Sequence, residues 1–183
     1  MEHPPAPCGI VTDIQELLRT GQRFPTVYAD PPWEHENTAS RTAARKHYRT
    51  LPLVALCSLP VADWVTSDAH LHLSATSPLL PQEFEVIDAW GFRYASCFVW
   101  TKPKLGMGNY WRVSHEFLLL GVRGSSRFSK RDQRSWQTWA RTRHSRKPLM
   151  IRMLIEQVSS GPYLEPKRLE NPASDNGSKR LVQ

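Results

Sequence analysis

Short apolar runs and amphipathic stretches alternate along this chain, and their order predicts an α/β domain. Runs typical of buried strands cover residues 24–29, 69–75, 94–101 and 116–122, with a shorter one at 163–164. Helical patterns occupy 13–19, a pair at 51–59 and 61–65, and two longer stretches at 81–90 and 148–158. Strands that alternate with helices in this way favour a layered sheet with helices on both faces.

The helix predicted at 148–158 is the strongest of these patterns. Four of its apolar residues share one face: Met150, Met153, Leu154 and Val158. The 183 residues, 40% of them apolar, fit one domain of ordinary size with a real core. We expect a lead segment at 1–23, the domain itself at 24–165, and a polar, flexible tail at 166–183.

Positive charge is concentrated in one part of the chain. The formal net charge is +7, and nine Lys or Arg stand against one Asp between positions 123 and 147. Trp136 and Trp139 interleave with these basic residues, as base-stacking side chains would. The segment therefore indicates a nucleic-acid partner, although a solvated, mobile basic loop has the same composition. The candidate contact residues are Arg127, Lys130, Arg131, Arg134, Arg141 and Arg143.

Cysteine and histidine spacing argues against a metal centre or a disulfide framework. The three cysteines are far apart in the sequence, with no C-x-x-C pair, which is typical of a reduced, cytoplasmic protein. His70 and His72 could share one face of a strand, but no Cys or carboxylate stands at ligand spacing, so we expect no metal site. No signal peptide is visible, and the longest apolar run, 117–122, is too short to cross a membrane.

The tetrad Asp30-Pro31-Pro32-Trp33 directly follows the first predicted strand. Two prolines fix the backbone and lack N–H donors, so their carbonyl oxygens act only as acceptors. Asp30 adds a charged acceptor, and Trp33 offers a flat face for stacking. A flat ring that bears an amine, such as adenine, needs this combination of acceptors and an aromatic platform.

Together with other segments, this tetrad resembles the MT-A70 family of S-adenosylmethionine-dependent adenine-N6 methyltransferases. The resemblance covers residues 24–164 and is carried by blocks in the family order: 28–33, 77–92, 98–102, 106–124 and 144–148. It implies a Rossmann-like methyltransferase sheet with permuted motif order, in which the catalytic motif precedes the main cofactor-binding strand. It also implies methyl transfer to the N6 amine of adenine in nucleic acid, with S-adenosylmethionine as cofactor; DNA is the first candidate substrate and RNA is the alternative.

The resemblance also assigns roles to individual residues. Asp30, Pro31, Pro32 and Trp33 would be catalytic, and Asp30 and Lys147 would also contact the cofactor. Substrate-binding positions would be Trp33, Tyr48, Arg112, Glu116 and Lys147, and Lys102 and Asn109 are expected to line the groove. Simpler structural roles are also open: Glu116 could pair with Arg112, and Lys147 could be an ordinary lysine in the first turn of a helix.

The chain departs from the family pattern after Leu164-Glu165, where Pro166 follows and the family's later Trp and Gly-Asn positions are absent. In the family those positions hold the ribose and adenine of the cofactor. A second hypothesis follows from this departure, namely a catalytically impaired nucleic-acid-binding relative that has lost cofactor binding.

Overall fold

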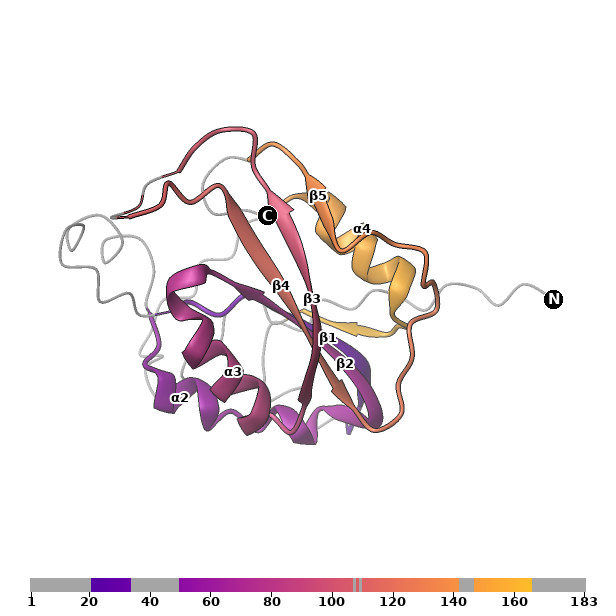
Figure 1. The fold of residues 1–183 in the computed structure, drawn as a ribbon. Coiled ribbons are helices and arrows are strands. Elements are labelled where there is room, and N and C mark those ends of the chain that lie inside the picture. Colours follow the sequence, from indigo (N-terminus) through magenta and orange to yellow (C-terminus); the bar gives the residue numbers. More distant parts are fainter. Residues whose placement is uncertain (1–20, 34–49, 107, 109, 142–146, 166–183) are drawn as a thin grey trace, which may run out of the picture.

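The computed structural model describes residues 21–33, 50–106, 108, 110–141 and 147–165, and these residues form one mixed sheet (Figure 1). The strand order is β5-β3-β4-β2-β1-β6. Among the paired strands, only β4 runs antiparallel to its neighbours. The strands are β1 (Phe24–Ala29), β2 (Val65–Ala75), β3 (Arg93–Thr101), β4 (His115–Arg123), β5 (Trp136–Thr138) and β6 (Tyr163–Leu164).

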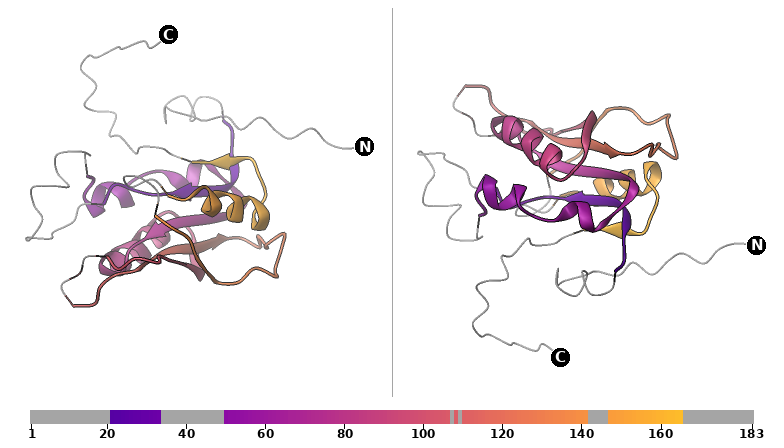
Figure 2. Two further views of the ribbon diagram at one scale, coloured as in Figure 1. Left: turned by 90° about the horizontal axis from the view of Figure 1, so that it is seen from above. Right: turned by 90° about the horizontal axis from the view of Figure 1, so that it is seen from below.

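Helices cover both faces of this sheet, as the sequence predicts (Figures 1 and 2). On one face lie α2 (Leu53–Cys57) and α3 (Leu80–Ala89), with short 3-10 turns at Val61–Asp63 and Ser77–Leu79. On the other face lies α4 (Leu149–Val158). The buried apolar residues accordingly form two clusters, a large one under α2 and α3 and a smaller one under α4.

The central strands are buried on both faces. In β2, every residue from Ala69 to Ala75 is buried, which is typical of a strand between two helical layers. In β1, Pro25 lies where the pairing with β2 shifts register between Phe24 and Thr26. A proline cannot donate to the ladder, so this irregularity accommodates it without the loss of a regular hydrogen bond.

Close packing between β4 and α3 depends on a glycine. A Cβ at Gly121 would lie 2.9 Å from Phe92 Cβ and 3.3 Å from Leu71 Cβ. The helix ends at Ala89 with Trp90 as its C-cap, and Gly91, at φ +78°, continues the chain in a conformation that favours glycine. Trp90, just before it, donates from Nε1 to the Leu56 carbonyl at 2.8 Å and thereby joins α3 to α2.

The apolar face predicted for α4 is buried only in part. Val158 is buried and Leu154 is half-buried, but Met150 and Met153 are exposed, and Ile151 and Ile155 are buried in their place. Both stripes have helical spacing, so the periodicity alone does not choose between them. The isoleucines pack in the smaller cluster, whose other buried members are Tyr28, Phe98, Trp100 and Leu118.

Other predicted elements differ from the structure at their edges. The helix pair predicted at 51–65 is one five-residue helix and one 3-10 turn, and Val65 already belongs to β2. The strands predicted around Ala69, Cys97 and Leu119 are confirmed and are longer than expected. Strand β5 lies in the segment interpreted as a basic loop. The sequence does not predict it, because its three residues are all exposed and show no alternation of apolar and polar positions. The predicted helix at 13–19 lies outside the described residues.

In the described residues, no helix is both long and apolar enough to span a bilayer. The same residues contain no group of three or more His, Cys, Asp or Glu side chains placed to hold a metal ion.

Replacement of Gly121 by alanine should destabilise the fold. The added methyl group would press on Phe92 and Leu71, and overpacking of this kind typically lowers the free energy of unfolding by about 1–3 kcal/mol. Urea denaturation followed by circular dichroism measures the change. Ser96→Ala, at an exposed position of β3, is the control, and equal midpoints for the two variants would contradict the packing argument.

Candidate active site

Polar residues from four parts of the chain meet at one edge of the sheet. The carboxyl ends of β1 and β3 lead directly into Asp30 and Lys102, and β4, being antiparallel, begins at this edge with His115 and Glu116. Lys147, just before α4, completes the group. Ligands of parallel α/β sheets bind at this edge, beyond the carboxyl ends of the strands.

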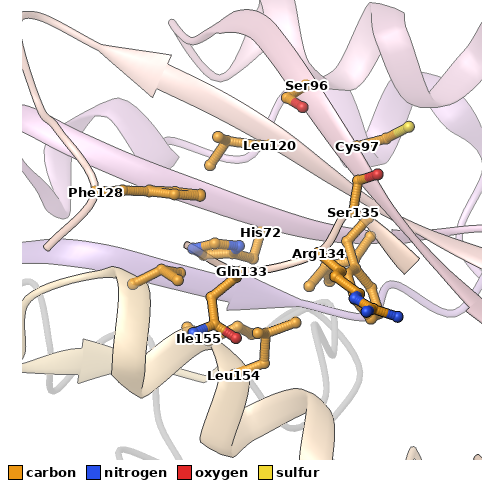
Figure 3. A pocket seen from close by; sticks show the side chains of 13 residues that line it. His72, Ser96, Cys97, Leu120, Phe128, Gln133, Arg134, Ser135, Leu154 and Ile155 are labelled. Carbon is orange, nitrogen blue, oxygen red and sulfur yellow. The ribbon is translucent and has the colours of Figure 1, made fainter. Parts of the chain in front are cut away.

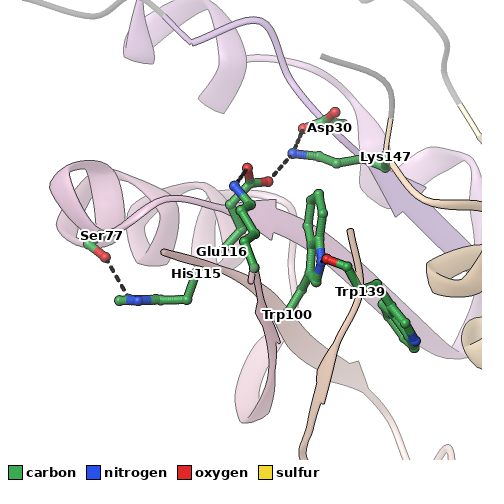
Figure 4. Close-up of polar contacts among 8 residues, drawn as sticks. Asp30, Ser77, Trp100, His115, Glu116, Trp139 and Lys147 are labelled. Carbon is green, nitrogen blue, oxygen red and sulfur yellow. Dashed lines mark hydrogen bonds and ion pairs between the residues drawn. The ribbon is translucent and has the colours of Figure 1, made fainter. Parts of the chain in front are cut away.

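The four charged residues form a chain of alternating sign (Figure 4). Lys147 Nζ lies 2.6 Å from Glu116 Oε2 and 3.3 Å from Asp30 Oδ1. Lys102 Nζ donates to the other Glu116 oxygen, Oε1. Two ammonium groups therefore alternate with two carboxylates, and their charges offset one another.

The two carboxylates are not equivalent in this chain. Glu116 uses one oxygen for each lysine, and its side chain is 20% exposed. Asp30 contacts only Lys147 among the described lysines, at the longer distance, and its side chain is 42% exposed. Asp30 is therefore the carboxylate with more capacity to accept a hydrogen bond from a ligand.

The pKa values of these groups reflect the same inequality. Loss of surrounding water raises the pKa of Asp30, and the attraction of Lys147 only partly opposes that effect. For Glu116, burial acts in the same direction, but Lys147 and Lys102 outweigh it and lower its pKa. Burial would lower the pKa of Lys147, yet the two carboxylates together raise it, so this lysine stays charged.

The simpler structural roles predicted for Glu116 and Lys147 are both wrong. Glu116 pairs with lysines, whereas Arg112 is exposed. Lys147 lies before Pro148, the N-cap of α4, and so outside the first helical turn. At this position its side chain is directed to the sheet edge, where it meets the two carboxylates (Figure 4).

The two proline carbonyls are partly engaged by the protein itself. Trp33 N–H donates to the Pro31 carbonyl at 2.9 Å, and Leu51 N–H donates to the Pro32 carbonyl at 2.8 Å. Because a carbonyl oxygen has two lone pairs, each retains capacity for one further donor. The tetrad is thus a turn closed by its own backbone and joined to the segment before α2.

Trp33 does not present an open stacking face in the described structure. Its side chain is 9% exposed and belongs to the large apolar cluster. A role in base stacking stays a prediction for this residue, and the structure favours core packing.

A second tryptophan, Trp100, contacts the ion-paired residues through Lys102. Trp100 is buried, donates from Nε1 to the Trp139 carbonyl at 2.9 Å, and lies with its ring 4.6 Å from Lys102 Nζ (Figure 4). This cation–π contact holds the lysine that neutralises Glu116. Trp139, predicted as a stacking residue, instead packs its ring on Phe98 at 5.6 Å.

A buried glutamate beside the site was missed by the sequence interpretation. Glu83 is fully buried and accepts a hydrogen bond at Oε1 from Thr76 N–H at 2.9 Å, while Oε2 has no partner among the described residues. Burial raises its pKa to about 7. A signal was available, because Glu83 shares the helical spacing of Val86, Ile87 and Trp90 and so falls on the buried face.

The two strand histidines do share a face, as predicted, and they meet a serine. His70 Nδ1 and His72 Nε2 lie 2.9 Å and 2.8 Å from the hydroxyl oxygen of Ser159, at the end of α4. Phe128 packs on both rings. Burial lowers the pKa of each histidine, to about 3 for His72, so both are neutral core residues.

Next to these histidines the structure contains a small cavity of about 130 Å³ between β3, β4, α4 and the basic segment (Figure 3). Its lining is mainly apolar and includes Phe98, Leu118, Phe128 and Ile155. None of the four ion-paired residues lines it, so this cavity is separate from the site around Asp30.

The basic segment is attached to the sheet rather than free of it. Phe128 packs on the histidines, Val99 N–H donates to the Ser135 carbonyl at 2.8 Å, and β5 pairs with β3. Five of the six predicted nucleic-acid contacts are exposed on it: Arg127, Lys130, Arg131, Arg134 and Arg141. Tyr48, Asn109 and Arg143 lie outside the described residues.

A comparison with protein-family models matches residues 24–170 of this chain to the model described as MT-A70. This chain belongs to the MT-A70 family. The match begins with β1 and includes every strand of the sheet, so the MT-A70 fold accounts for the whole layered structure. The Rossmann-like α/β methyltransferase sheet that the sequence resemblance implies is thereby confirmed.

Two relatives are similar to this MT-A70 protein. One is the type II methyltransferase M.MunI of Mycoplasma sp, 27% identical over 151 residues, which cover 71% of this chain and 65% of that protein. The other, from Medicago truncatula, is named as an MT-A70-like N(6)-adenosine-methyltransferase. It is 24% identical over 148 residues, which cover 76% of this chain and 23% of that protein. The chain therefore spans less than two thirds of the length of either relative.

The buried Glu83 should make the stability of this MT-A70 domain pH-dependent. Its pKa in the folded state, about 7, lies above the ordinary value of 4.5, so the folded state binds the proton more tightly. The free energy of unfolding should therefore fall, by on the order of 3 kcal/mol, as the pH rises from about 4.5 to above 7.

Urea denaturation at a series of pH values measures this dependence. Glu83→Gln keeps the acceptor for Thr76 N–H and removes the titration, so it should flatten the profile in this range. Glu85→Gln, at an exposed position of the same helix, should leave the profile unchanged. A free energy of unfolding that still falls with pH in Glu83→Gln would contradict the assignment of this dependence to Glu83.

Proposed function

We propose that this protein transfers a methyl group from S-adenosylmethionine to the N6 amine of adenine in nucleic acid, with DNA as the preferred substrate. The single observation that carries the proposal is the position of Asp30. Its carboxylate lies at the carboxyl end of β1, is partly exposed, and is held by Lys147 without being fully occupied. Membership of the MT-A70 family and the names of both relatives support the same reaction.

The described residues suit the reactive part of S-adenosylmethionine. Asp30 follows β1, and the parallel strand β6 pairs with β1 as far as Val27 and Leu164, so Asp30 lies beyond the carboxyl ends of parallel strands, where α/β sheets bind cofactors. A carboxylate there favours a positively charged sulfur, and the Lys147 ammonium suits a carboxylate of the ligand. When bound, S-adenosylmethionine supplies a methyl group carried on that charged sulfur.

The chain's own residues would prepare the adenine amine. This nitrogen is a poor nucleophile because its lone pair is delocalised into the ring. Asp30 Oδ accepts one amine hydrogen, and the Pro31 carbonyl accepts the other with the lone pair that Trp33 N–H leaves free. With both hydrogens held, the nitrogen moves toward tetrahedral geometry and its lone pair is directed at the methyl group.

As the N–C bond forms and the C–S bond breaks, positive charge develops on the nitrogen. Asp30 stabilises this charge, and its Oδ takes the proton that the nitrogen then releases. Glu116, which is itself paired with Lys102, holds Lys147 in place, so Lys147 limits the negative charge at Asp30 without moving into the reacting position.

The nucleic acid would approach across the basic segment. Its exposed arginines and Lys130 supply the positive charge that a phosphate backbone needs, and Trp136 remains half-exposed among them. In a duplex the target base would swing out of the helix to reach Asp30.

The competing proposal is a nucleic-acid-binding relative that has lost cofactor binding, motivated by the altered sequence after Glu165. Isothermal titration with S-adenosylmethionine separates the two. Saturable binding supports the transferase, and absence of binding at millimolar cofactor supports the competing proposal.

Replacement of Asp30 by alanine should lower methyl transfer by on the order of 10²–10³-fold, because one preorganised charged acceptor is lost. Transfer of a radiolabelled methyl group to duplex DNA, single-stranded DNA and RNA measures the rate, and mass spectrometry of the digested product identifies the modified base. Asp88→Ala removes an exposed carboxylate from α3 and should retain full activity. Near-native turnover in Asp30→Ala would overturn the proposed mechanism.

Replacement of Lys147 by methionine should move the acid limb of the pH–rate profile to higher pH. The lysine opposes the rise in the pKa of Asp30, so its removal lets that pKa rise further, and Asp30 takes up a proton at a higher pH. The dependence of kcat/KM on pH reports this shift. Arg93→Gln, at the opposite edge of the sheet, is the control, and an unshifted limb in Lys147→Met would show that Asp30 does not govern it.

A further inference from the structure

The loop that joins β3 to β4 projects beyond the ends of these strands (Figure 1) and carries exposed aromatic side chains. Tyr110 is 96% exposed and Trp111 is 88% exposed, and Leu105 in the same loop is also exposed. Large apolar side chains that gather in solvent mark interaction surfaces more often than isolated ones do. The loop begins at Lys102 and ends at Ser114, two residues before Glu116, so both of its ends adjoin the ion-paired site.

The two arms of this loop are packed against each other through their backbones. Lys102 N–H donates to the Ser114 carbonyl at 2.7 Å at the base of the loop. Further out, a Cβ at Gly106 would collide with the Val113 carbonyl oxygen and would lie 2.8 Å from Arg141 Nη2. The backbone approach leaves no room for side chains between the arms, so the aromatic residues are held on the outside.

The charge of the loop indicates the kind of partner. Residues 102–114 contain Lys102, Lys104 and Arg112 and no Asp or Glu. Lys104 and Arg112 are exposed, and Arg141 of the basic segment lies against Gly106, so the loop continues the positive surface. Aromatic rings on a basic support are the combination that stacks on nucleobases beside a phosphate backbone.

We propose that the β3–β4 loop is a stacking wedge for duplex DNA, in which Tyr110 and Trp111 insert beside the target adenine and take the stacking contacts that it leaves. The inference rests on the proposed function and extends it by naming how the base is extruded. Removal of a base from a duplex breaks its stacking on both neighbours. An inserted side chain replaces part of that contact and keeps the gap open. The wedge therefore stands between the duplex and Asp30.

The test compares two duplexes with the double variant Tyr110→Ala/Trp111→Ala. In the first, the target adenine is paired with thymine, and in the second it lies opposite an abasic site, where extrusion requires less work. On the paired duplex, the variant should transfer methyl groups at least tenfold more slowly than the parent protein. On the second duplex, its rate should be close to that of the parent protein. Equal losses on both duplexes, or no loss on either, would overturn the wedge.

Tyr94→Ala is the matched control. Tyr94 is an exposed tyrosine near the start of β3, at the opposite edge of the sheet, and its removal should leave the ratio of the two rates unchanged. Because Tyr110 and Trp111 are almost fully exposed, the double variant should unfold at the same urea concentration as the parent protein. That measurement separates a wedge from a folding defect.

A binding measurement separates failure of the wedge from failure of the proposed function. Stacking on bases quenches tryptophan fluorescence, so duplex DNA added to the parent protein without cofactor should quench more signal than in Trp111→Phe. If quenching differs in this way but no substrate is methylated, the loop stacks on DNA and the proposed methyltransferase function is refuted. Identical quenching in both proteins would show that Trp111 does not touch DNA and would assign the exposed loop to a protein partner instead.

Discussion

The position of one ammonium group between two carboxylates is the constraint on which this site depends. Lys147 lies at the junction of α4 with the sheet, and it is attracted to Asp30 after β1 and to Glu116 on β4. Each of these elements belongs to a different part of the chain. Were the lysine absent, two carboxylates would face each other at a partly buried edge, where like charges repel strongly. The attraction therefore fixes both the geometry and the charge of the site.

The reversed direction of β4 makes this arrangement possible. In a fully parallel sheet, the edge beyond the strand ends receives only the residues that follow each strand. Because β4 is antiparallel, its first residues, His115 and Glu116, arrive at that edge together with the loop that precedes them. One strand thus contributes a charged side chain directly to the site, and its preceding loop projects beside the same opening.

The sequence predicts the parts of this structure that depend on local pattern. The strands around Val27 and Val99 follow from short apolar runs, the strand around Leu71 follows from an alternating pattern, and Asp30 is placed by the strand before it. Pairing between distant segments leaves no such pattern. Strand β5 forms because its backbone meets β3, and Lys102 meets Glu116 only because β3 and β4 are neighbours. The face of α4 was likewise decided by the residues beneath it, since two apolar stripes were equally periodic.

The serine between two histidines imposes a condition on the protons of the core. The hydroxyl group of Ser159 has a single hydrogen, so it can donate to only one of the rings of His70 and His72. At least one imidazole must therefore carry its hydrogen on the nitrogen that faces the serine. A residue at the end of α4 therefore restricts the tautomers of two histidines on β2. The position of the hydrogen on one ring depends on its position on the other.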